Sequence, residues 1–331
     1  MPLLEIQDLQ IDFDKTRAVD QVSLSIAEGE TLCLVGESGC GKSVTALSIG
    51  RLLATPPARY TGGRVLLQDR DVLAMSPSEL RSIRGGVVSY IFQEPGASLN
   101  PVTRIGDQMI ESLRLHAPNR AHPGEVVRLL QRVGIPAPES RARDYPHQLS
   151  GGMQQRVMIA MALATEPKLL IADEPTTALD VTIQAQVLGL MRQLRSELGT
   201  AIVLITHDLG VVAEMADRVV VMYAGQVVEQ APVRALFAMP QHPYTVGLMG
   251  AIPCLATDGD RLAAIDGMVP AATAMPEGCR FASRCPFVEA RCRSEVPPLQ
   301  EVEPGHFSRC WQRASTKGQR LDLELSTRAV A

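Results

Sequence analysis

Short apolar runs alternate with longer amphipathic segments along most of this chain. Compact runs rich in valine, isoleucine and leucine favour buried strands, whereas apolar residues spaced three or four apart favour helices. Helices are predicted at 43–53 and 181–198, and helical periodicity dominates 104–164. Strands are predicted at 31–36, 63–68, 87–93, 168–174, 200–208 and, as a hairpin, 218–229. Strands that alternate with helices indicate an α/β fold.

The composition changes after about Ala231, where proline, glycine and cysteine become more frequent and regular periodicity fades. We therefore place a domain boundary between 230 and 255. The expected organisation is a first domain over 1–235, with a helical subdomain at about 98–165. A small, irregular, cysteine-rich extension is expected over 236–331.

Composition and charge narrow the classes of partner. The 331 residues carry a formal net charge of −4, which offers no basic surface to nucleic acid. No apolar run approaches the roughly 18–20 residues that cross a bilayer, and the first residues lack the pattern of a signal peptide. The seven cysteines therefore favour reduced thiols or metal ligands over disulfides.

The segment GESGCGKS, residues 36–43, fits the pattern G-x-x-x-x-G-K-[ST] of a phosphate-binding loop. It lies between a predicted strand and a predicted helix, as such a loop requires. Its glycines let backbone N–H groups approach phosphate oxygens, and the helix adds its positive end. Lys42 supplies charge for the β- and γ-phosphates, and Ser43 supplies a hydroxyl for Mg²⁺. The loop residues expected to bind ATP are Gly36, Ser38, Gly39, Cys40, Gly41, Lys42 and Ser43.

Cys40 lies inside this loop, at the start of a predicted helix. A position at a helix N-terminus lowers the pKa of a thiol and favours the reactive thiolate. The alternative interpretation is a small residue that the loop tolerates.

Two acidic residues close the apolar run LLIADE, at the end of a predicted strand where α/β proteins bind ligands. We predict that Asp173 holds Mg²⁺ through water. We predict that Glu174 orients or deprotonates the attacking water.

The segment LSGGMQQR, residues 149–156, resembles the signature of ATP-binding cassette (ABC) ATPases, which simpler phosphate-loop enzymes lack. Gln93 in IFQEP resembles this family's Q-loop glutamine, and His207 in LITHD resembles its switch histidine. The resemblance covers roughly residues 4–230. It implies that Gln93 contacts Mg²⁺ and nucleotide, and that Gln93 and His207 join Glu174 in catalysis. It also places Phe13 against adenine, although a core position explains Phe13 equally well.

Ser150, Gly151 and Gly152 precede a helical segment and so form a second anion site with close backbone access. In the family that the chain resembles, this site serves the nucleotide held by a partner subunit. Asp180 in ALD resembles the D-loop aspartate and is expected to assist nucleotide binding. Two cassettes then face each other and sandwich two ATP molecules. The resemblance therefore implies a second copy or a paralogous ATPase as partner.

The segment QHPYTVGLMGAIP, residues 241–253, and the GCRFASRC region resemble the C-terminal extension of oligopeptide and dipeptide importer ATPases. The resemblance implies an ATP-hydrolysing subunit that powers peptide import from the cytoplasmic face of the inner membrane. Its partners would be a paralogous ATPase, two permeases and, indirectly, an external binding protein. The helical stretch 104–147, with the Q-loop before it, would either receive a permease or serve only as a lid subdomain. The alternatives are a nickel- or glutathione-type importer ATPase of the same subfamily, or a regulatory ATPase with no role in transport.

Four cysteines near the end of the chain show the spacing C-x5-C-x6-C-x17-C, namely Cys279, Cys285, Cys292 and Cys310. Structural zinc usually has more closely spaced cysteine pairs, whereas four thiolates suit a [4Fe–4S] cluster. The pattern also resembles that of peptide importer ATPases in which a cluster has been recognised. We predict a [4Fe–4S] cluster, with zinc and free buried thiols as alternatives. The neighbouring arginines at 280, 284, 291 and 293 are expected to offset its charge.

Overall fold

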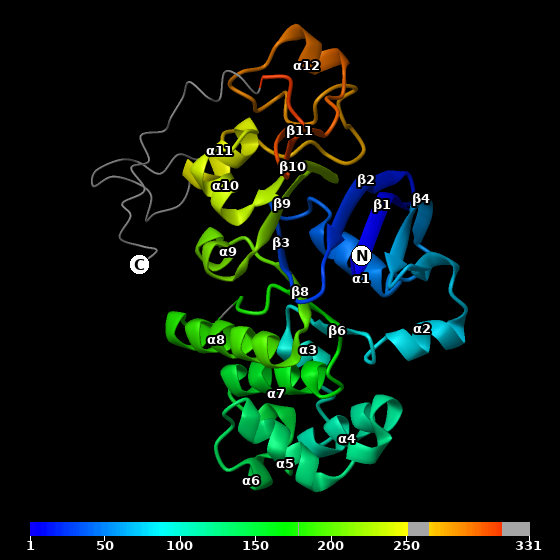
Figure 1. Cartoon of the computed structure of the whole chain (residues 1–331), viewed down its shortest axis with the longest axis vertical. Coiled ribbons are helices and arrows are strands. Elements are labelled where there is room, and N and C mark those ends of the chain that lie inside the picture. The colour runs from blue at the N-terminus through cyan, green and yellow to red at the C-terminus, as the bar shows by residue number, and fades with distance from the viewer. Residues whose placement is uncertain (178, 251–264, 313–331) are drawn as a thin grey trace.

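The computed structural model describes residues 1–177, 179–250 and 265–312. Figure 1 shows a molecule that is longer in one direction, with a group of helices at one end and the cysteine-rich extension at the other. The two sheets lie between these ends. This arrangement confirms the predicted α/β class with an added C-terminal extension.

The larger sheet contains eight strands within the described residues, in the order β11-β12-β10-β9-β3-β8-β7-β6. Strands β6 to β9 and β3 form its parallel part, and continuous apolar runs bury both of its faces. The strands are β3 (Thr31–Val35), β6 (Val88–Ile91), β7 (Leu169–Asp173), β8 (Ala201–Ile205), β9 (Arg218–Tyr223), β10 (Gln226–Pro232), β11 (Gln300–Glu303) and β12 (His306–Ser308).

A second, antiparallel sheet has the order β2-β1-β4-β5. Its strands are β1 (Leu4–Phe13), β2 (Thr16–Ile26), β4 (Ala58–Leu67) and β5 (Arg70–Asp71). Sequence patterning predicted only part of β4. The alternation in β1 and β2 is broken by register shifts, and Asp8 and Gln21 adopt φ values of 46° and 50°. These irregularities move side chains to the other face and hide the simple period of two.

Helices cover the sheets and fill the segment between β6 and β7. The predicted helix over 181–198 has those same bounds, because Asp180 caps its start and Gly199, at φ 65°, ends it. The helix predicted at 43–53 ends earlier, before Gly50. The helices outside the β6–β7 segment are α1 (Lys42–Ile49), η1 (Val72–Ala74), α2 (Pro77–Ile83), α8 (Val181–Leu198), α9 (Leu209–Met215), α10 (Val233–Ala238), α11 (Pro243–Gly250) and α12 (Ala290–Ser294).

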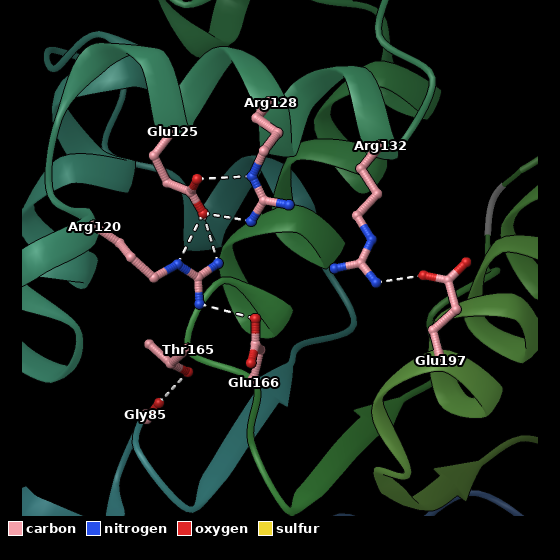
Figure 2. Close-up of polar contacts among 8 residues, drawn as sticks. All are labelled: Gly85, Arg120, Glu125, Arg128, Arg132, Thr165, Glu166 and Glu197. Atoms are coloured by element: carbon pink, nitrogen blue, oxygen red, sulfur yellow. Dashed lines mark hydrogen bonds and ion pairs between the residues drawn. The ribbon is translucent and has the colours of Figure 1, made fainter.

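The segment between β6 and β7, called the helical region below, contains α3 (Pro95–Ser98), α4 (Ile105–His116), η2 (Pro118–Arg120), α5 (Pro123–Arg132), α6 (Pro138–Arg141), η3 (Pro146–Gln148) and α7 (Gly151–Leu163). Figure 2 shows its polar links to the core. Arg120 contacts both Glu125 and Glu166, the latter at 3.0 Å, and Arg132 pairs with Glu197 on α8. The region therefore has ion pairs at its border as well as an apolar core shared with the sheet.

The extension joins the larger sheet through β12, which pairs antiparallel with β10. The fully buried carboxylate of Glu229 on β10 accepts backbone N–H bonds from Gln241 and His242 at 2.6 and 2.9 Å. His306 Nε2 on β12 lies 2.7 Å from the same carboxylate. This buried cluster fixes two segments of the extension, at residues 241–242 and at β12, to one strand of the cassette. Within the described residues, no helix has the length and apolar character needed to cross a membrane.

Candidate functional site

The phosphate loop runs from the end of β3 to the start of α1 and is held close to its neighbours. Gly36 has φ 145°, and a Cβ there would lie 2.2 Å from the carbonyl oxygen of Met222. Gly41 has φ 98°, and a Cβ there would lie 2.7 Å from the carbonyl oxygen of Ala18. The loop therefore requires glycine at both positions, since any side chain would meet backbone.

Lys42 is buried within this loop. Its Nζ donates to the carbonyl oxygens of Gly36 and Glu37 at 2.7 and 2.9 Å. An ammonium in this position places a full positive charge at the centre of the loop. That charge suits the anionic phosphates of a nucleotide.

The Cys40 thiol is fully buried beneath the loop, 3.6 Å from Lys42 Nζ. Burial raises the pKa of the thiol, and the positive charge of Lys42 only partly opposes that effect. The lowered pKa expected from the helix N-terminus was therefore wrong. Cys40 is better explained as a small side chain packed into the loop's core.

Asp173 lies at the end of β7, beside the start of α1. Burial raises the pKa of its carboxyl group, while a hydrogen bond with Ser43 lowers it and Glu174 raises it further. The Ser43 hydroxyl and the Asp173 carboxylate thus meet at one point next to Lys42. Oxygen ligands paired in this way are those that Mg²⁺ prefers, so this pair would hold the ion beside the phosphates.

Three side chains from the ends of β6, β7 and β8 converge on one another. Gln93 Nε2 donates to Glu174 Oε2 at 3.0 Å, and His207 Nδ1 lies 3.3 Å from Glu174 Oε1. Thr177 Oγ1 also donates to Glu174 Oε2, at 2.9 Å. Glu174 adopts φ 47°, a costly conformation for a residue with a side chain. The structure therefore brings together the three predicted catalytic residues, and sequence analysis missed Thr177.

The signature residues lie at the start of α7. Ser150 caps this helix by accepting the Met153 N–H, and Asp180 caps α8 by accepting the Ile183 N–H at 2.9 Å. A Cβ on Gly152 would lie 3.1 Å from Ile183 Cγ2, so the two helix starts are adjacent. Phe13, at the end of β1, is partly buried against an apolar core that includes Leu9, Val22 and Val65. Roles for these residues in nucleotide binding stay predictions.

The four clustered cysteines of the extension line one cavity, together with Phe281, Phe287 and Trp311. Burial raises the pKa of Cys279, and it raises those of Cys285 and Cys310 to about 11 and about 12. Among the described residues, no group of three or more His, Cys, Asp or Glu side chains is arranged to hold a metal ion. The thiols are therefore gathered, but not in the tight geometry of a single-ion site.

Two of the four arginines beside these cysteines face away from the cavity, whereas Arg291 lies over the ring of Trp311 at 3.5 Å from its centroid. Arg280 pairs with Asp20 at 2.5 Å, and Arg284 pairs with Glu37 at 2.9 Å. Both carboxylates belong to the nucleotide-binding part of the chain, so these arginines do not serve mainly to offset charge in the cavity. Arg309, which sequence analysis missed, lowers the pKa of Cys279 by its charge, against the larger effect of burial.

The fold and the site define a class of protein: an ATPase with a phosphate loop, a carboxylate pair after β7 and a helical region between β6 and β7. Comparison with known proteins agrees. The model of the ABC transporter family matches residues 19–177, and the model of the oligopeptide/dipeptide transporter C-terminal region matches residues 228–292.

Two curated relatives match nearly the whole chain. A probable peptide ABC transporter ATP-binding protein of Sinorhizobium fredii is 50% identical, with 94% of this chain and 95% of the relative covered. A putative peptide import ATP-binding protein of Brucella ovis is 51% identical, with coverage of 94% and 98%. This chain belongs to the family of ABC transporter ATP-binding proteins, and it is an ATPase of that family.

Solved structures give the same fold. The ATP-binding cassette MJ0796, in a dimeric post-hydrolysis state with ADP and phosphate, has a TM-score of 0.60 and 28% identity. The matched part spans 70% of this chain and 99% of the MJ0796 chain. The cbiO1 protein of Clostridium perfringens, part of the transporter complex cbiONQ, has a TM-score of 0.63 and 28% identity, and covers 72% of this chain and 91% of its own.

Proposed function

We propose that this protein is the ATP-hydrolysing subunit of a membrane importer for oligopeptides or dipeptides. The observation that carries the chemistry is the convergence of Gln93, Glu174 and His207 beside the phosphate loop. The peptide assignment is supported by the match of residues 228–292 and by the two relatives described as peptide transport proteins. A nickel- or glutathione-type importer ATPase remains the alternative, since the solute does not touch this subunit.

Each side chain of the site has a distinct task in this proposal. The loop amides and Lys42 bind the phosphates. Ser43 and Asp173 would hold Mg²⁺, which when bound would neutralise charge on the transferred phosphoryl group. Glu174 accepts the proton of the attacking water. Gln93 and His207 fix the Glu174 carboxylate through the contacts described above, and His207 also reaches the γ-phosphate.

A second cassette completes the site. Ser150 and Asp180, which cap the N-termini of α7 and α8, are exposed. We infer that they serve the nucleotide of a partner ATPase, either a paralogue or a second copy. MJ0796, which shares this fold, was solved as a dimer. The isolated monomer is therefore expected to hydrolyse ATP slowly.

A groove beside the Q-loop is the proposed docking surface for a permease. Its lining residues include Tyr90 of β6, Phe92, Leu99, Ser112 of α4, and Met158 and Met161 of α7. The exposed ring of Phe92 directly precedes Gln93, so a helix seated here would connect to the catalytic cluster. The subunit would then lie on the cytoplasmic face of the inner membrane, with two permeases and an external binding protein as the remaining components.

The catalytic assignment is tested by Glu174→Gln in the assembled complex. Removal of the general base should lower ATP turnover by roughly a hundredfold or more while ATP binding is retained. A matched control is Glu166→Gln, because Glu166 is also a glutamate with positive φ but pairs with Arg120 at the border of the helical region. Turnover of the Glu174 variant equal to that of the control would contradict the assignment.

We also propose that Cys279, Cys285, Cys292 and Cys310 hold a [4Fe–4S] cluster. The cavity with four thiols supplies the required donor set, and Trp311 has a buried indole N–H without a hydrogen-bond partner in the described residues. Such a donor suits the sulfides of a cluster. The spacing C-x5-C-x6-C-x17-C favours a cluster over zinc, whose cysteine pairs are usually closer, while among the described residues no side-chain group is arranged to hold a metal ion.

The cluster proposal predicts a brown protein after anaerobic purification, with about four irons and four sulfides per chain. Thiols bind iron as thiolates, so loading must release protons and should weaken as the pH falls; burial adds to this effect by raising the pKa values of Cys279, Cys285 and Cys310. Iron and sulfide analysis of the wild type and of Cys285→Ser measures this, with Cys33→Ser as a buried cysteine control outside the cavity. Stoichiometric zinc without sulfide would overturn the proposal.

A further inference from the structure

The extension reaches back to the phosphate loop through one residue pair. Arg284, whose side chain is only 5% exposed, directly precedes Cys285. Its Nη1 donates to both carboxylate oxygens of Glu37, at 3.0 and 2.9 Å. Glu37 is the second residue of the phosphate loop. A residue of the cysteine-rich segment therefore neutralises the acidic side chain of the nucleotide site.

The backbone of Glu37 is held from the same side. The Tyr244 hydroxyl, on α11 of the extension, accepts the Glu37 N–H at 2.9 Å. The Tyr244 ring is fully buried and packs against Tyr223 and Phe281, with centroid distances of 4.6 and 5.5 Å. Phe281 lies between Cys279 and Cys285, so the cysteine-rich segment supports this contact as well.

Arg284 has little freedom to move independently of the cysteines. Its Nε and Nη2 donate to the carbonyl oxygens of Asp266 and Ile265, both at 3.0 Å. Its own N–H donates to the carbonyl of Phe281 at 3.0 Å, within the turn that also bonds Ala282 to Cys279. A displacement of this turn would therefore displace the guanidinium from Glu37.

A second bridge runs beside the first. Arg280, next to Cys279, donates to the Ala224 carbonyl and to the Asp20 carboxylate. The adjoining Gly225 N–H donates to the Cys40 carbonyl of the phosphate loop at 3.0 Å. The hairpin turn between β9 and β10 is thus held between an arginine of the extension and the loop itself.

We propose that Arg284 is a positioning residue for the phosphate loop, and that it couples the nucleotide site to the four-cysteine cavity. Paired with Arg284, Glu37 presents little net charge to the phosphates. Unpaired, its carboxylate would repel them and the start of the loop would lose its anchor. If Arg284 couples the two sites, nucleotide binding should in turn change the environment of the cavity. The proposal requires the ATP site of the proposed function, but neither the peptide assignment nor the cluster.

The test is a double-mutant cycle on the full chain, with Mg²⁺ and a non-hydrolysable ATP analogue. Arg284→Ala should weaken analogue binding roughly tenfold, in the usual range of coupling between sites. The double variant Glu37→Gln/Arg284→Ala should recover much of this loss, because the repelling charge is gone. A merely structural role for Arg284 would leave the double variant as weak as the single one.

Arg293→Ala is the matched control, since Arg293 also adjoins a cavity cysteine but is exposed. Trp311, the single tryptophan of the chain, lines the cavity. Its fluorescence therefore reports whether nucleotide binding changes the environment of the cavity. Its fluorescence should change on nucleotide binding in the wild type and in Arg293→Ala, but not in Arg284→Ala. If Arg284→Ala does not fold, Arg284→Lys should show the same order of effects at smaller size. Unchanged affinity in the Arg284 variant, or no Trp311 response in the wild type, would overturn the proposal.

Discussion

The helical region and the extension lie at opposite ends of the molecule and are joined to the nucleotide-binding core by different polar contacts (Figure 1). The ion pair that joins the helical region to α8 is substantially exposed: the Arg132 and Glu197 side chains are 23% and 39% exposed. The polar contacts that attach the extension are less exposed: the Arg280 and Asp20 side chains of one ion pair are 12% and 15% exposed, and Glu229 and His306 are 0% and 1% exposed. Both ends also share one apolar core with the larger sheet.

This difference has an energetic meaning. An exposed ion pair contributes little, because water and salt screen it and its partners can exchange. A buried pair is costly to break, because a desolvated charge is left without a partner. We therefore expect the helical region to shift against the core at modest cost. The extension should instead behave as part of the nucleotide site, which fits the Arg284–Glu37 contact.

The largest expected effect comes from breaking the buried attachment at Glu229. Glu229→Ala leaves two backbone N–H groups and His306 without their acceptor, so it should lower the free energy of unfolding by roughly 3–5 kcal/mol. Chemical denaturation measures this. Glu295→Ala is the control, because Glu295 is exposed and its one ion pair within the described part of the chain is with Arg291, at 3.0 Å. Equal loss in both variants would remove the contrast between buried and exposed contacts.

A smaller, pH-dependent effect is expected inside the helical region. The hydrogen bonds from Arg128, opposed by burial and aided by Arg120, lower the pKa of Glu125 to about 2 (Figure 2). A carboxylate with a lowered pKa stabilises the fold fully above its ordinary value of 4.5, and this contribution fades as the pH falls toward 2. Glu125→Gln should therefore cost about 1–3 kcal/mol near pH 7.

The measurement is the difference in melting temperature between the wild type and Glu125→Gln from pH 7 down to 3.5. This difference in melting temperature should narrow as the pH falls, because only the wild type loses a charge at this site. Glu111→Gln, an exposed glutamate on α4, should show no such trend. A difference that stays constant with pH would show that the Glu125 charge is not what stabilises this region.

Much of the nucleotide site was predictable, because its parts are local in sequence. The phosphate loop is a contiguous motif, and Asp173, Glu174 and His207 follow apolar strands whose ends meet at one edge of a parallel sheet. The bounds of α8 were also predictable, since both caps are sequence signals. Strands β1 and β2 were not, because bulges interrupt their alternation.

The features of the site that could not be predicted from the sequence depend on burial and on contacts between residues far apart in the chain. The raised pKa of Cys40 comes from packing that no local pattern reveals. Arg284 and Glu37 lie 247 positions apart, so the arginine appeared to serve the adjacent cysteines. The fold instead directs it to the phosphate loop. Whether the first domain ends at 235 stays a prediction.

Hydrogen exchange of the full wild-type chain, with and without Mg²⁺ and a non-hydrolysable ATP analogue, tests the central claim most directly. The claim is that the cysteine-rich segment is part of the nucleotide site. Nucleotide should slow exchange both in the phosphate loop, residues 36–43, and in the segment 279–285. Arg284→Ala should abolish the second effect and leave the first in place at saturating nucleotide. Protection of the loop alone in the wild type, with residues 279–285 unchanged, would contradict the account.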